Sequence, residues 1–226
     1  MNSSTYNLCP VNHESIFERC AWFYAFCREL LFTDHTDDIA ASLIPLLHQP
    51  FRPVLFEVGC GPGFYSSRLA KRFPQLDVVG IDPSEGLLTL ARRTADRHRL
   101  TNCRFVRAHV QQLSDSPETA DFIIASRLFL ILINRGFALQ AVHTALKPNG
   151  ILFIAEPISS FRAALPLACM HLLQRLNGSR KPLAPPIRCH VLDTTEFADF
   201  VGSQPWKRVR RWSDRRYQYA LCEKSQ

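Results

Sequence analysis

The sequence predicts an α/β protein built on a doubly wound, Rossmann-like sheet that is mostly parallel, and three observations support this. Short apolar segments alternate with amphipathic helical segments between residues 54 and 156. The apolar segment 54–58 runs directly into a glycine-rich turn and then a helix. Two final segments, Lys207–Trp212 and Arg216–Glu223, have the pattern of an antiparallel hairpin. Together these segments predict a seven-stranded sheet.

The glycine-rich turn is the most informative stretch of the sequence. Val54–Val58 reads as a buried parallel strand that is apolar except for Glu57, and glycines follow at positions 59, 61 and 63. Such a turn lets the backbone approach a ligand closely, and the helix after it offers unpaired N–H groups. The spacing is Glu-x-Gly-x-Gly-x-Gly, which differs from the Gly-x-Gly-x-x-Gly of dinucleotide-binding folds. A carboxylate so close to the turn favours a ligand with positive charge over a bare pyrophosphate.

A second acidic residue stands at the end of the next predicted strand. Leu76–Asp82 is apolar apart from its acids and ends in Asp82, about 20 residues after the glycine turn. An acid at this position holds a ribose diol in Rossmann-type folds. The alternative is a turn residue, since Ser84 is placed to cap the following helix. We favour the ribose role because both motifs suit one ligand.

These motifs resemble motif I of the class I S-adenosyl-L-methionine (SAM) dependent methyltransferases, and the turn Leu146–Gly150 (Leu-Lys-Pro-x-Gly) resembles the same family. The segment Phe17-Glu18-x-x-Ala21-x-x-Tyr24 resembles the Phe-Asp-x-x-Ala-x-x-Tyr segment of ubiquinone/menaquinone-type C-methyltransferases. The resemblance implies SAM as the cofactor, and the ammonium and sulfonium of SAM suit a nearby carboxylate. It also implies that Tyr24 lies near the SAM carboxylate. The alternative is that the aromatic residues of this helix form a core-facing stripe.

The resemblance implies a set of cofactor-binding residues but no catalytic residue and no metal ligand. At Ala108-His109-Val110, relatives carry Gly-Asp-Ala, and their aspartate accepts a hydrogen bond from the adenine amino group. In this sequence His109 or the backbone of Val110 would make that contact with adenine instead. The expected cofactor-binding residues are Tyr24, Glu57, Gly59, Cys60, Gly61, Gly63, Asp82, Pro83, His109, Val110 and Ser126. Other candidates on crevice loops, none specified by spacing, are His13, Tyr65, Arg127, Glu156, His171 and His190.

The remaining elements follow from periodicity and turn residues. Residues 34–38 read as a polar capping turn rather than a metal cluster. Residues 1–50 are expected to form an N-terminal helical cap, and residues 51–226 the SAM-binding domain. Within this domain, residues 158–190 are expected to form a lid-like insert that contains an apolar helix at 161–176. The alternative is that this helix is an extra helix packed on the domain. Helices are predicted at 13–31, 39–47, 65–73, 86–99, 136–146 and 194–203, the last capped by Thr194, and further strands at 103–107, 121–126 and 151–156.

Composition limits the cellular setting. The 226 residues fit one doubly wound domain with additions, and the longest apolar run, Leu128–Ile133, is far too short to span a membrane. No secretory signal is visible, and the 8 cysteines contain no Cys-x-x-Cys pair, which indicates free thiols in a reducing cytoplasm. Residues 157–226 carry 12 Lys/Arg against 5 Asp/Glu, so this basic third could contact an anionic substrate, a membrane surface or RNA.

These observations favour a SAM-dependent methyltransferase that acts on a small, hydrophobic acceptor. One alternative is an RNA methyltransferase that uses the basic C-terminal third, where Lys207–Trp212 interleaves aromatic and basic residues. The other is a non-catalytic SAM-fold binding protein, because His109 departs from the family pattern. The absence of Asn-Pro-Pro-Tyr and Pro-Cys motifs argues against nucleic acid as the substrate. Peripheral membrane contact through the basic third stays open, as does the oligomeric state.

Overall fold

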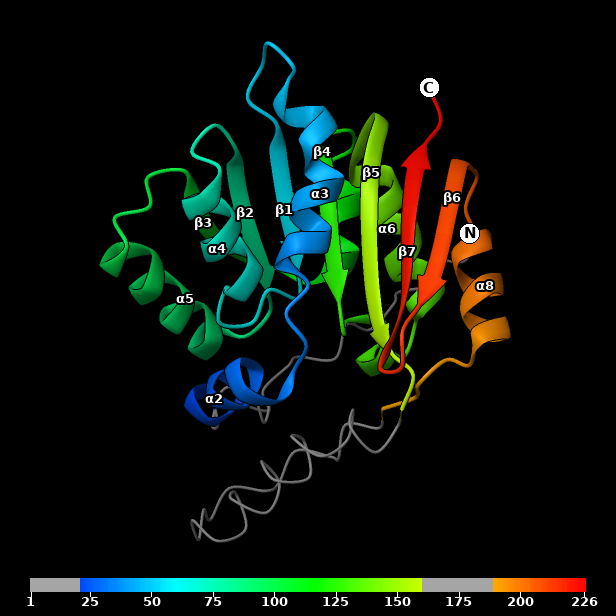
Figure 1. Ribbon diagram of the computed structural model, residues 1–226, viewed down its shortest axis with the longest axis horizontal. Helices are drawn as coiled ribbons and strands as arrows, with labels where there is room; N and C mark the ends of the chain where they lie inside the picture. The colour runs from blue at the N-terminus through cyan, green and yellow to red at the C-terminus, as the bar shows by residue number, and fades with distance from the viewer. Residues whose placement is uncertain (1–20, 160–188) are drawn as a thin grey trace, which may run out of the picture.

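The computed structural model of the protein describes residues 21–159 and 189–226. Their strands form a seven-stranded sheet in the order β3-β2-β1-β4-β5-β7-β6 (Figure 1). The predicted fold class is therefore confirmed. Five strands are parallel and the last two form the antiparallel C-terminal hairpin: β1 Val54–Val58, β2 Asp77–Asp82, β3 Cys103–Arg107, β4 Ala120–Ser126, β5 Leu146–Pro157, β6 Trp206–Ser213 and β7 Tyr217–Lys224.

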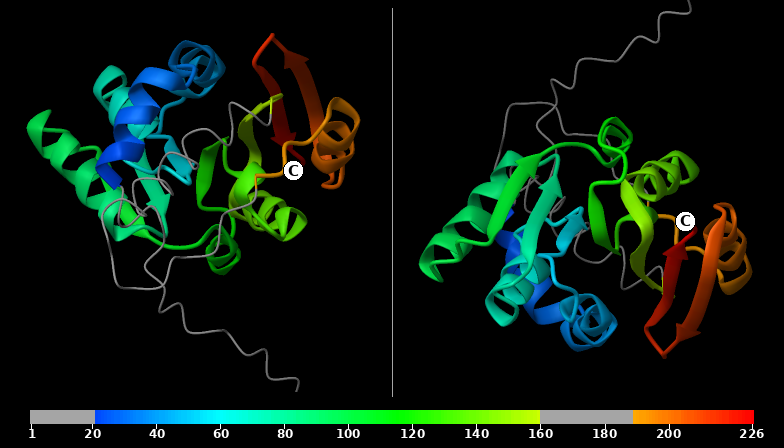
Figure 2. Two further views of the ribbon diagram at one scale, coloured as in Figure 1. Left: turned by 90° about the horizontal axis from the view of Figure 1, so that it is seen from below. Right: turned by 90° about the horizontal axis from the view of Figure 1, so that it is seen from above.

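Helices cover both faces of the sheet (Figure 2). One face carries α3 (Thr36–Leu47) and α4 (Phe64–Arg72), with α5 (Glu85–Arg97) beside α4 at the β3 edge. The other face carries α6 (Arg135–Ala145), the 3-10 helix η1 (Val110–Asp115) and α8 (Thr194–Gly202). Helix α2 (Ala21–Leu31) lies beyond the carboxyl ends of the parallel strands, where ligands bind in open α/β sheets (Figure 1).

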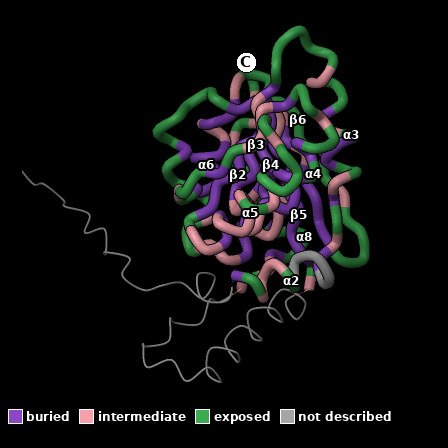
Figure 3. The backbone as a smooth tube through the Cα atoms, turned by 90° about the vertical axis from the view of Figure 1, so that its left-hand side faces the viewer, coloured by how far each residue is buried: buried purple, intermediate pink, exposed green. Residues whose placement is uncertain are grey.

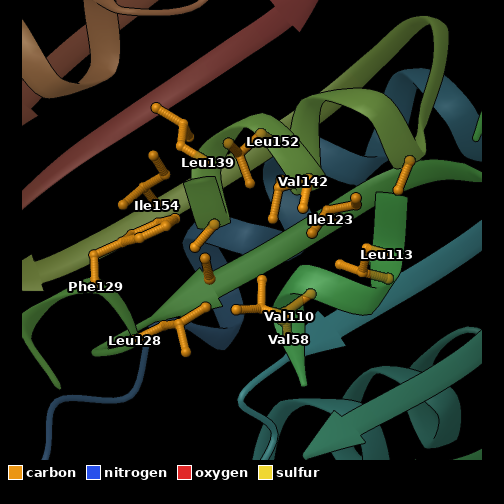
Figure 4. Close-up of a cluster of buried hydrophobic side chains, with 14 of the residues drawn as sticks. Val58, Val110, Leu113, Ile123, Leu128, Phe129, Leu139, Val142, Leu152 and Ile154 are labelled. Carbon is orange, nitrogen blue, oxygen red and sulfur yellow. The ribbon is translucent and has the colours of Figure 1, made fainter. Parts of the chain in front are cut away.

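The core lies on both faces of the sheet because successive side chains of a strand point to opposite faces. Leu55, Phe122 and Phe153 pack toward α3 and α4. Their neighbours in sequence pack toward α6, in the cluster that Figure 4 draws. Figure 3 shows the buried segments concentrated in the strands between the helical layers. The sheet is therefore a rigid base for the loops at its carboxyl edge.

Two local predictions were wrong. The predicted turn at 146–150 is part of β5, because Leu146 pairs with Ala120 of β4 before a register shift leads to the pairing of Ile151 with Phe122. The cap of α8 is Asp193, one residue before the predicted Thr194, and its carboxylate accepts hydrogen bonds from the backbone N–H groups of Thr195 and Glu196 at 2.8 Å.

Other predictions on the periphery have mixed outcomes. The predicted capping turn at 34–38 is wrong in its bounds, because α3 already begins at Thr36 and its N-cap residue, His35, makes no side-chain capping bond. The Asp34 carboxylate, just before the cap, accepts a hydrogen bond from the backbone N–H of Thr36 at 2.9 Å. Residues 21–159 and 189–226 hold no group of three or more metal-ligating side chains, and no helix in them could cross a bilayer. The apolar helix at 161–176, most of the insert and residues 13–20 lie outside the described residues.

Candidate functional site

The turn after β1 is held tightly against the end of β2. The backbone N–H groups of Gly59 and Cys60 both donate to the carbonyl oxygen of Ile81, at 2.8 and 3.0 Å. Gly61 has φ +52°, in the left-handed region that side chains other than glycine rarely adopt. A Cβ atom at Gly61 would lie 3.3 Å from Cε1 of Tyr24. The tyrosine of α2 therefore lies directly over the glycine turn.

The structure brings Asp82 and the glycine turn together. Asp82 is buried at the tip of β2, where Oδ2 accepts a hydrogen bond from Gly61 N and Oδ1 accepts one from Ser84 N, both at 2.9 Å. Ser84 in turn caps α5, since its Oγ accepts a hydrogen bond from Leu87 N at 3.3 Å. Asp82 thus holds both the glycine turn after β1 and the start of the turn after β2. A hydrogen bond to a ribose would be an addition to this structural role.

Glu57 supports the helix that follows the glycine turn. Its carboxylate is buried, and Oε2 accepts hydrogen bonds from the backbone N–H of Ser66, at 2.6 Å, and from the Ser66 hydroxyl. Ser66 lies in the first turn of α4, where the helix dipole favours a negative charge. This carboxylate therefore fixes α4 to β1, and its action on a bound cation stays a prediction.

Cys60 is held in the glycine turn by its backbone, whose N–H donates to Ile81 O at 3.0 Å and whose carbonyl oxygen accepts from Gly63 N at 2.9 Å. The side chain is buried against Leu88, Ala91 and Phe105. Burial raises the pKa of the Cys60 thiol well above its usual value, and the fields of Glu57 and Asp82 add to the shift. The thiol is therefore neutral and is a poor nucleophile.

The other predicted cofactor residues lie along the same edge of the sheet. His109 is exposed, and its backbone N–H donates to Oε1 of Gln112 at 2.7 Å, so His109 begins η1. The Val110 side chain packs in the core beside Leu113, which leaves only its backbone for a ligand (Figure 4). Pro83 is exposed and Ser126, the last residue of β4, is half-buried.

The histidine and tyrosine candidates do not gather in the crevice. Tyr65 is buried under α3, where its ring stacks with that of His35, so it is a core residue. His190 lies at the surface beside a cavity of about 770 Å³ lined by residues 131–137, and its Nδ1 accepts a hydrogen bond from Arg135 Nη1 at 2.8 Å. His13 and His171 lie outside the described residues.

Glu156 is a buried acid at the end of β5. Its Oε1 accepts a hydrogen bond from the backbone N–H of Phe129 at 2.8 Å, in the 3-10 helix η2 (Phe129–Ile131), whereas Oε2 has no hydrogen-bond partner among the described residues. Burial raises the pKa of Glu156 to about 7, although this bond and the charge of Arg127 oppose the shift. This side chain fixes η2 to the end of β5.

Sequence reasoning missed the surroundings of Arg127, although it singled out the residue. The Arg127 guanidinium carbon lies 3.8 Å from the centroid of the Phe32 ring, just after α2. Its Nη1 donates a hydrogen bond to the Tyr217 hydroxyl at 3.3 Å. The three residues come from distant parts of the chain, so no local spacing could have revealed their contact.

The described residues fit a bound SAM molecule. Gly61 adopts a left-handed conformation that favours glycine, and a buried acid stands at the tip of the neighbouring strand. Tyr24 covers the turn from the side of α2. These are the features that a nucleoside with a cationic tail requires of a crevice.

Comparison with known proteins agrees with this geometry. Residues 55–150 match the family model described as a methyltransferase domain. Over 177 residues the chain is 27% identical to trans-aconitate 2-methyltransferase of Methylobacterium nodulans, covering 78% of this chain and 64% of the relative. It is 24% identical to the malonyl-[acyl-carrier protein] O-methyltransferase of Halalkalibacterium halodurans, covering 76% and 61%.

Solved structures share the fold. The magnesium protoporphyrin IX methyltransferase of Synechocystis, solved with bound S-adenosylhomocysteine, superposes with a TM-score of 0.58 at 16% identity, covering 92% of this chain and 85% of that one. At this identity the likeness concerns the fold alone. The chain spans less than two thirds of the length of the two curated relatives named above.

Proposed function

We propose that this chain, whose residues 55–150 form a class I SAM-dependent methyltransferase domain, transfers the methyl group of SAM to a small acceptor molecule. The observation that supports the proposal is the hydrogen bond between Asp82 and Gly61, because it brings the acid at the tip of β2 against the glycine turn after β1. SAM supplies an electrophilic methyl group. The protein then has to align the acceptor with that group and exclude water from the crevice.

The cofactor residues expected from the sequence are part of the proposal. In it Asp82 binds the ribose, the backbone of the glycine turn contacts the amino-acid part of SAM, and Tyr24 closes the crevice from above. The adenine contact is assigned to the η1 end of the crevice, at His109 or the backbone of Val110. In this scheme residues 1–50 contribute the cap and 158–190 the lid-like insert, with 51–226 as the binding domain.

The proposed acceptor combines an apolar body with a carboxyl group. The apolar part is supported by large hydrophobic side chains that stay exposed at the carboxyl end of the sheet: Trp22, Phe26, Ile133 and Phe137, exposed by 57% to 98%. The acidic part is supported by the two named relatives, since trans-aconitate and malonyl groups both carry carboxylates. We therefore propose a small lipophilic acid, of which the carboxylate oxygen is the simplest methyl acceptor.

The basic C-terminal hairpin does not favour the RNA-methylating alternative. Lys207 pairs with Glu223 at 2.7 Å, and the Arg210 guanidinium lies 5.0 Å from the Trp212 ring centroid. These contacts are those of an edge strand whose charged face meets solvent. A membrane contact through this hairpin stays a prediction.

Labelled SAM tests the proposal. The purified protein is incubated with methyl-labelled SAM and a cell extract, with trans-aconitate in a parallel reaction, and the products are extracted into organic solvent. A carboxyl acceptor gives extractable label that alkali releases as methanol. The matched Gly61→Val protein should transfer none. Label that stays with precipitated RNA or protein would contradict a small-molecule acceptor, and the absence of any SAM binding would contradict the assignment as a whole.

A further inference from the structure

The end of the molecule beside the β6–β7 hairpin carries large apolar side chains in contact with solvent. Ile133, between η2 and α6, is 98% exposed, and Phe137, in the first turn of α6, is 65% exposed. Ile158, directly after β5, is exposed as well. Apolar side chains that gather on a surface mark a contact with another molecule or with a membrane.

Hydrogen bonds join the start of α6 to the hairpin. The guanidinium of Arg135, the first residue of α6, donates to the carbonyl oxygen of His190 at 2.6 Å. Two residues later, the carbonyl oxygen of Leu192 accepts a hydrogen bond from Nε2 of Gln218, in β7, at 2.7 Å. The loop before α6, residues 190–192 and the hairpin are therefore adjacent parts of one end of the molecule.

The tip of the hairpin adds positive charge to this end. Arg215 and Arg216 are both exposed, and neither makes an ion pair with a described residue. The carbonyl oxygen of Arg216 accepts a hydrogen bond from Ile158 N at 2.9 Å, so an exposed apolar residue lies beside the arginines. The acid of the turn, Asp214, instead bonds the Tyr219 hydroxyl at 2.7 Å and the backbone N–H groups of residues 216 and 217. It stabilises the turn and leaves both guanidinium groups to solvent.

This surface lies at the carboxyl edge of the sheet. The start of β7 pairs with the end of β5, which places the hairpin tip at that edge. Figure 1 shows the turn between β6 and β7 at the same end of the molecule as α2. The exposed apolar residues and the arginines therefore share the end of the molecule at which the proposed SAM crevice opens.

We propose that this end of the protein docks on the surface of a membrane that contains anionic lipids. Arginines beside such a surface bind lipid phosphates, and apolar side chains enter the boundary between headgroups and acyl chains. Trp212, next to the hairpin tip, is half-buried, and tryptophan is favoured at that boundary. A nucleic acid would use the arginines but not the exposed Ile133, whereas a bilayer accounts for both.

The inference goes beyond the proposed function, because docking needs neither SAM nor methyl transfer. The two proposals fit together, since a lipophilic acid partitions into a bilayer. A protein docked in this way would meet such an acceptor where it is concentrated.

Sedimentation with vesicles tests docking of the full chain and the part that charge takes in it. Vesicles of phosphatidylcholine alone are compared with vesicles in which one third of the lipid is phosphatidylglycerol. The double variant Arg215→Gln/Arg216→Gln removes the charge of the tip. The control is Arg93→Gln/Arg97→Gln, because these two arginines are exposed on α5, at the β3 edge of the sheet, and removing them changes the net charge equally.

The wild type should bind the mixed vesicles more tightly than the neutral ones, and added salt should weaken this preference. Arg215→Gln/Arg216→Gln should weaken binding to the mixed vesicles about tenfold or more. The control pair should bind as the wild type does. A wild type that does not sediment with the mixed vesicles would overturn the inference, as would an equal loss in both arginine pairs.

A second pair of variants tests the apolar part of the surface. Ile133→Ser should weaken binding to both kinds of vesicle about tenfold, because an isoleucine that enters the bilayer loses its contact with water. The control is Ile44→Ser, since Ile44 is 50% exposed on α3, on the opposite face of the sheet from α6. If the wild type binds poly(U) or polyglutamate as tightly as vesicles, and Ile133→Ser changes none of these affinities, the partner is a soluble polyanion and the membrane proposal is wrong.

Calorimetry with SAM on the same preparations checks folding and keeps the two proposals apart. SAM affinity should be equal in the wild type and the four variants. A wild type that binds SAM but no vesicles would overturn this inference alone. One that binds vesicles but no SAM would overturn the proposed function alone.

Discussion

The carboxylate of Asp82 accepts a hydrogen bond from the backbone N–H of Gly61 at 2.9 Å, which joins the tip of β2 to the turn after β1. These residues lie 21 positions apart in the chain. One acid thus shapes the glycine turn, and the proposed contact with the ribose would be its second role, so substitution can separate the two.

Asp82→Ala should weaken SAM binding about tenfold to hundredfold, because the variant loses charge-assisted hydrogen bonds worth about 1.5–3 kcal/mol. Asp82→Asn is the matched variant: it keeps an oxygen that accepts from Gly61 N but loses the charge. Calorimetry with SAM, alongside circular dichroism to check folding, measures both. A folded Asp82→Ala protein with unchanged affinity would assign Asp82 to the turn alone.

Gly61→Val should abolish SAM binding. The substitution places a branched side chain at φ +52°, with its Cβ 3.3 Å from the Tyr24 ring, and so fills the crevice. The control is Gly136→Val, since a Cβ at Gly136 meets no atom of the described residues within 4 Å. Equilibrium dialysis with labelled SAM compares the two proteins, and retained binding in Gly61→Val would argue that the ligand does not enter over this turn.

The pH dependence of stability should report Glu156. Its folded-state pKa of about 7 lies above the usual value of 4.5, so the folded state holds a proton that the unfolded state has lost between these pH values. The contribution of Glu156 to stability should therefore be fully present below about pH 4.5 and fall as the pH rises to about 7, by about 3 kcal/mol.

Glu156→Gln should remove this dependence, because the amide stays neutral and can still accept the hydrogen bond from Phe129 N. Urea unfolding of both proteins at pH 5 and pH 8 measures the effect. Wild type and variant with the same change in unfolding free energy between the two pH values would show that another group titrates.

Tyr24→Phe tests the role implied for this tyrosine at the SAM carboxylate. Loss of a hydroxyl that bonds a charged group should weaken SAM binding about tenfold or more. Trp22→Phe is the control, since Trp22 is a neighbouring exposed aromatic residue. Titration calorimetry on both proteins decides the matter. An unchanged affinity in Tyr24→Phe would leave Tyr24 as a packing residue over the glycine turn.

The sequence predicted elements whose signal is local. The bounds of β1 and β3 match the prediction: β1 is an apolar run that ends at Gly59, and β3 follows a polar turn and carries apolar residues between two arginines. The proximity of Asp82 to Gly61 was also predictable, since the carboxyl ends of neighbouring parallel strands meet at one edge. The start of β5 was not, because it depends on the pairing of Leu146 with Ala120, which no local pattern records.

The same limit applies to the site. The contact of Arg127 with Phe32 and the burial of Glu156 under Phe129 arise from packing between separate elements. The cap of α8 was missed for a different reason: Asp193 and Thr194 are adjacent residues of similar capping tendency, and the backbone conformation at Asp193 decides between them.

Both outer strands of the sheet carry exposed arginines: Arg104 and Arg107 on β3, and Arg208, Arg210 and Arg211 on β6. An open edge can template the addition of a strand from another molecule, and charge on that edge opposes it. Two copies that approach edge to edge would bring like charges together. The positive charge on β6 therefore opposes edge-to-edge extension of the sheet. Replacement of the exposed arginines of β6 by neutral residues should promote aggregation.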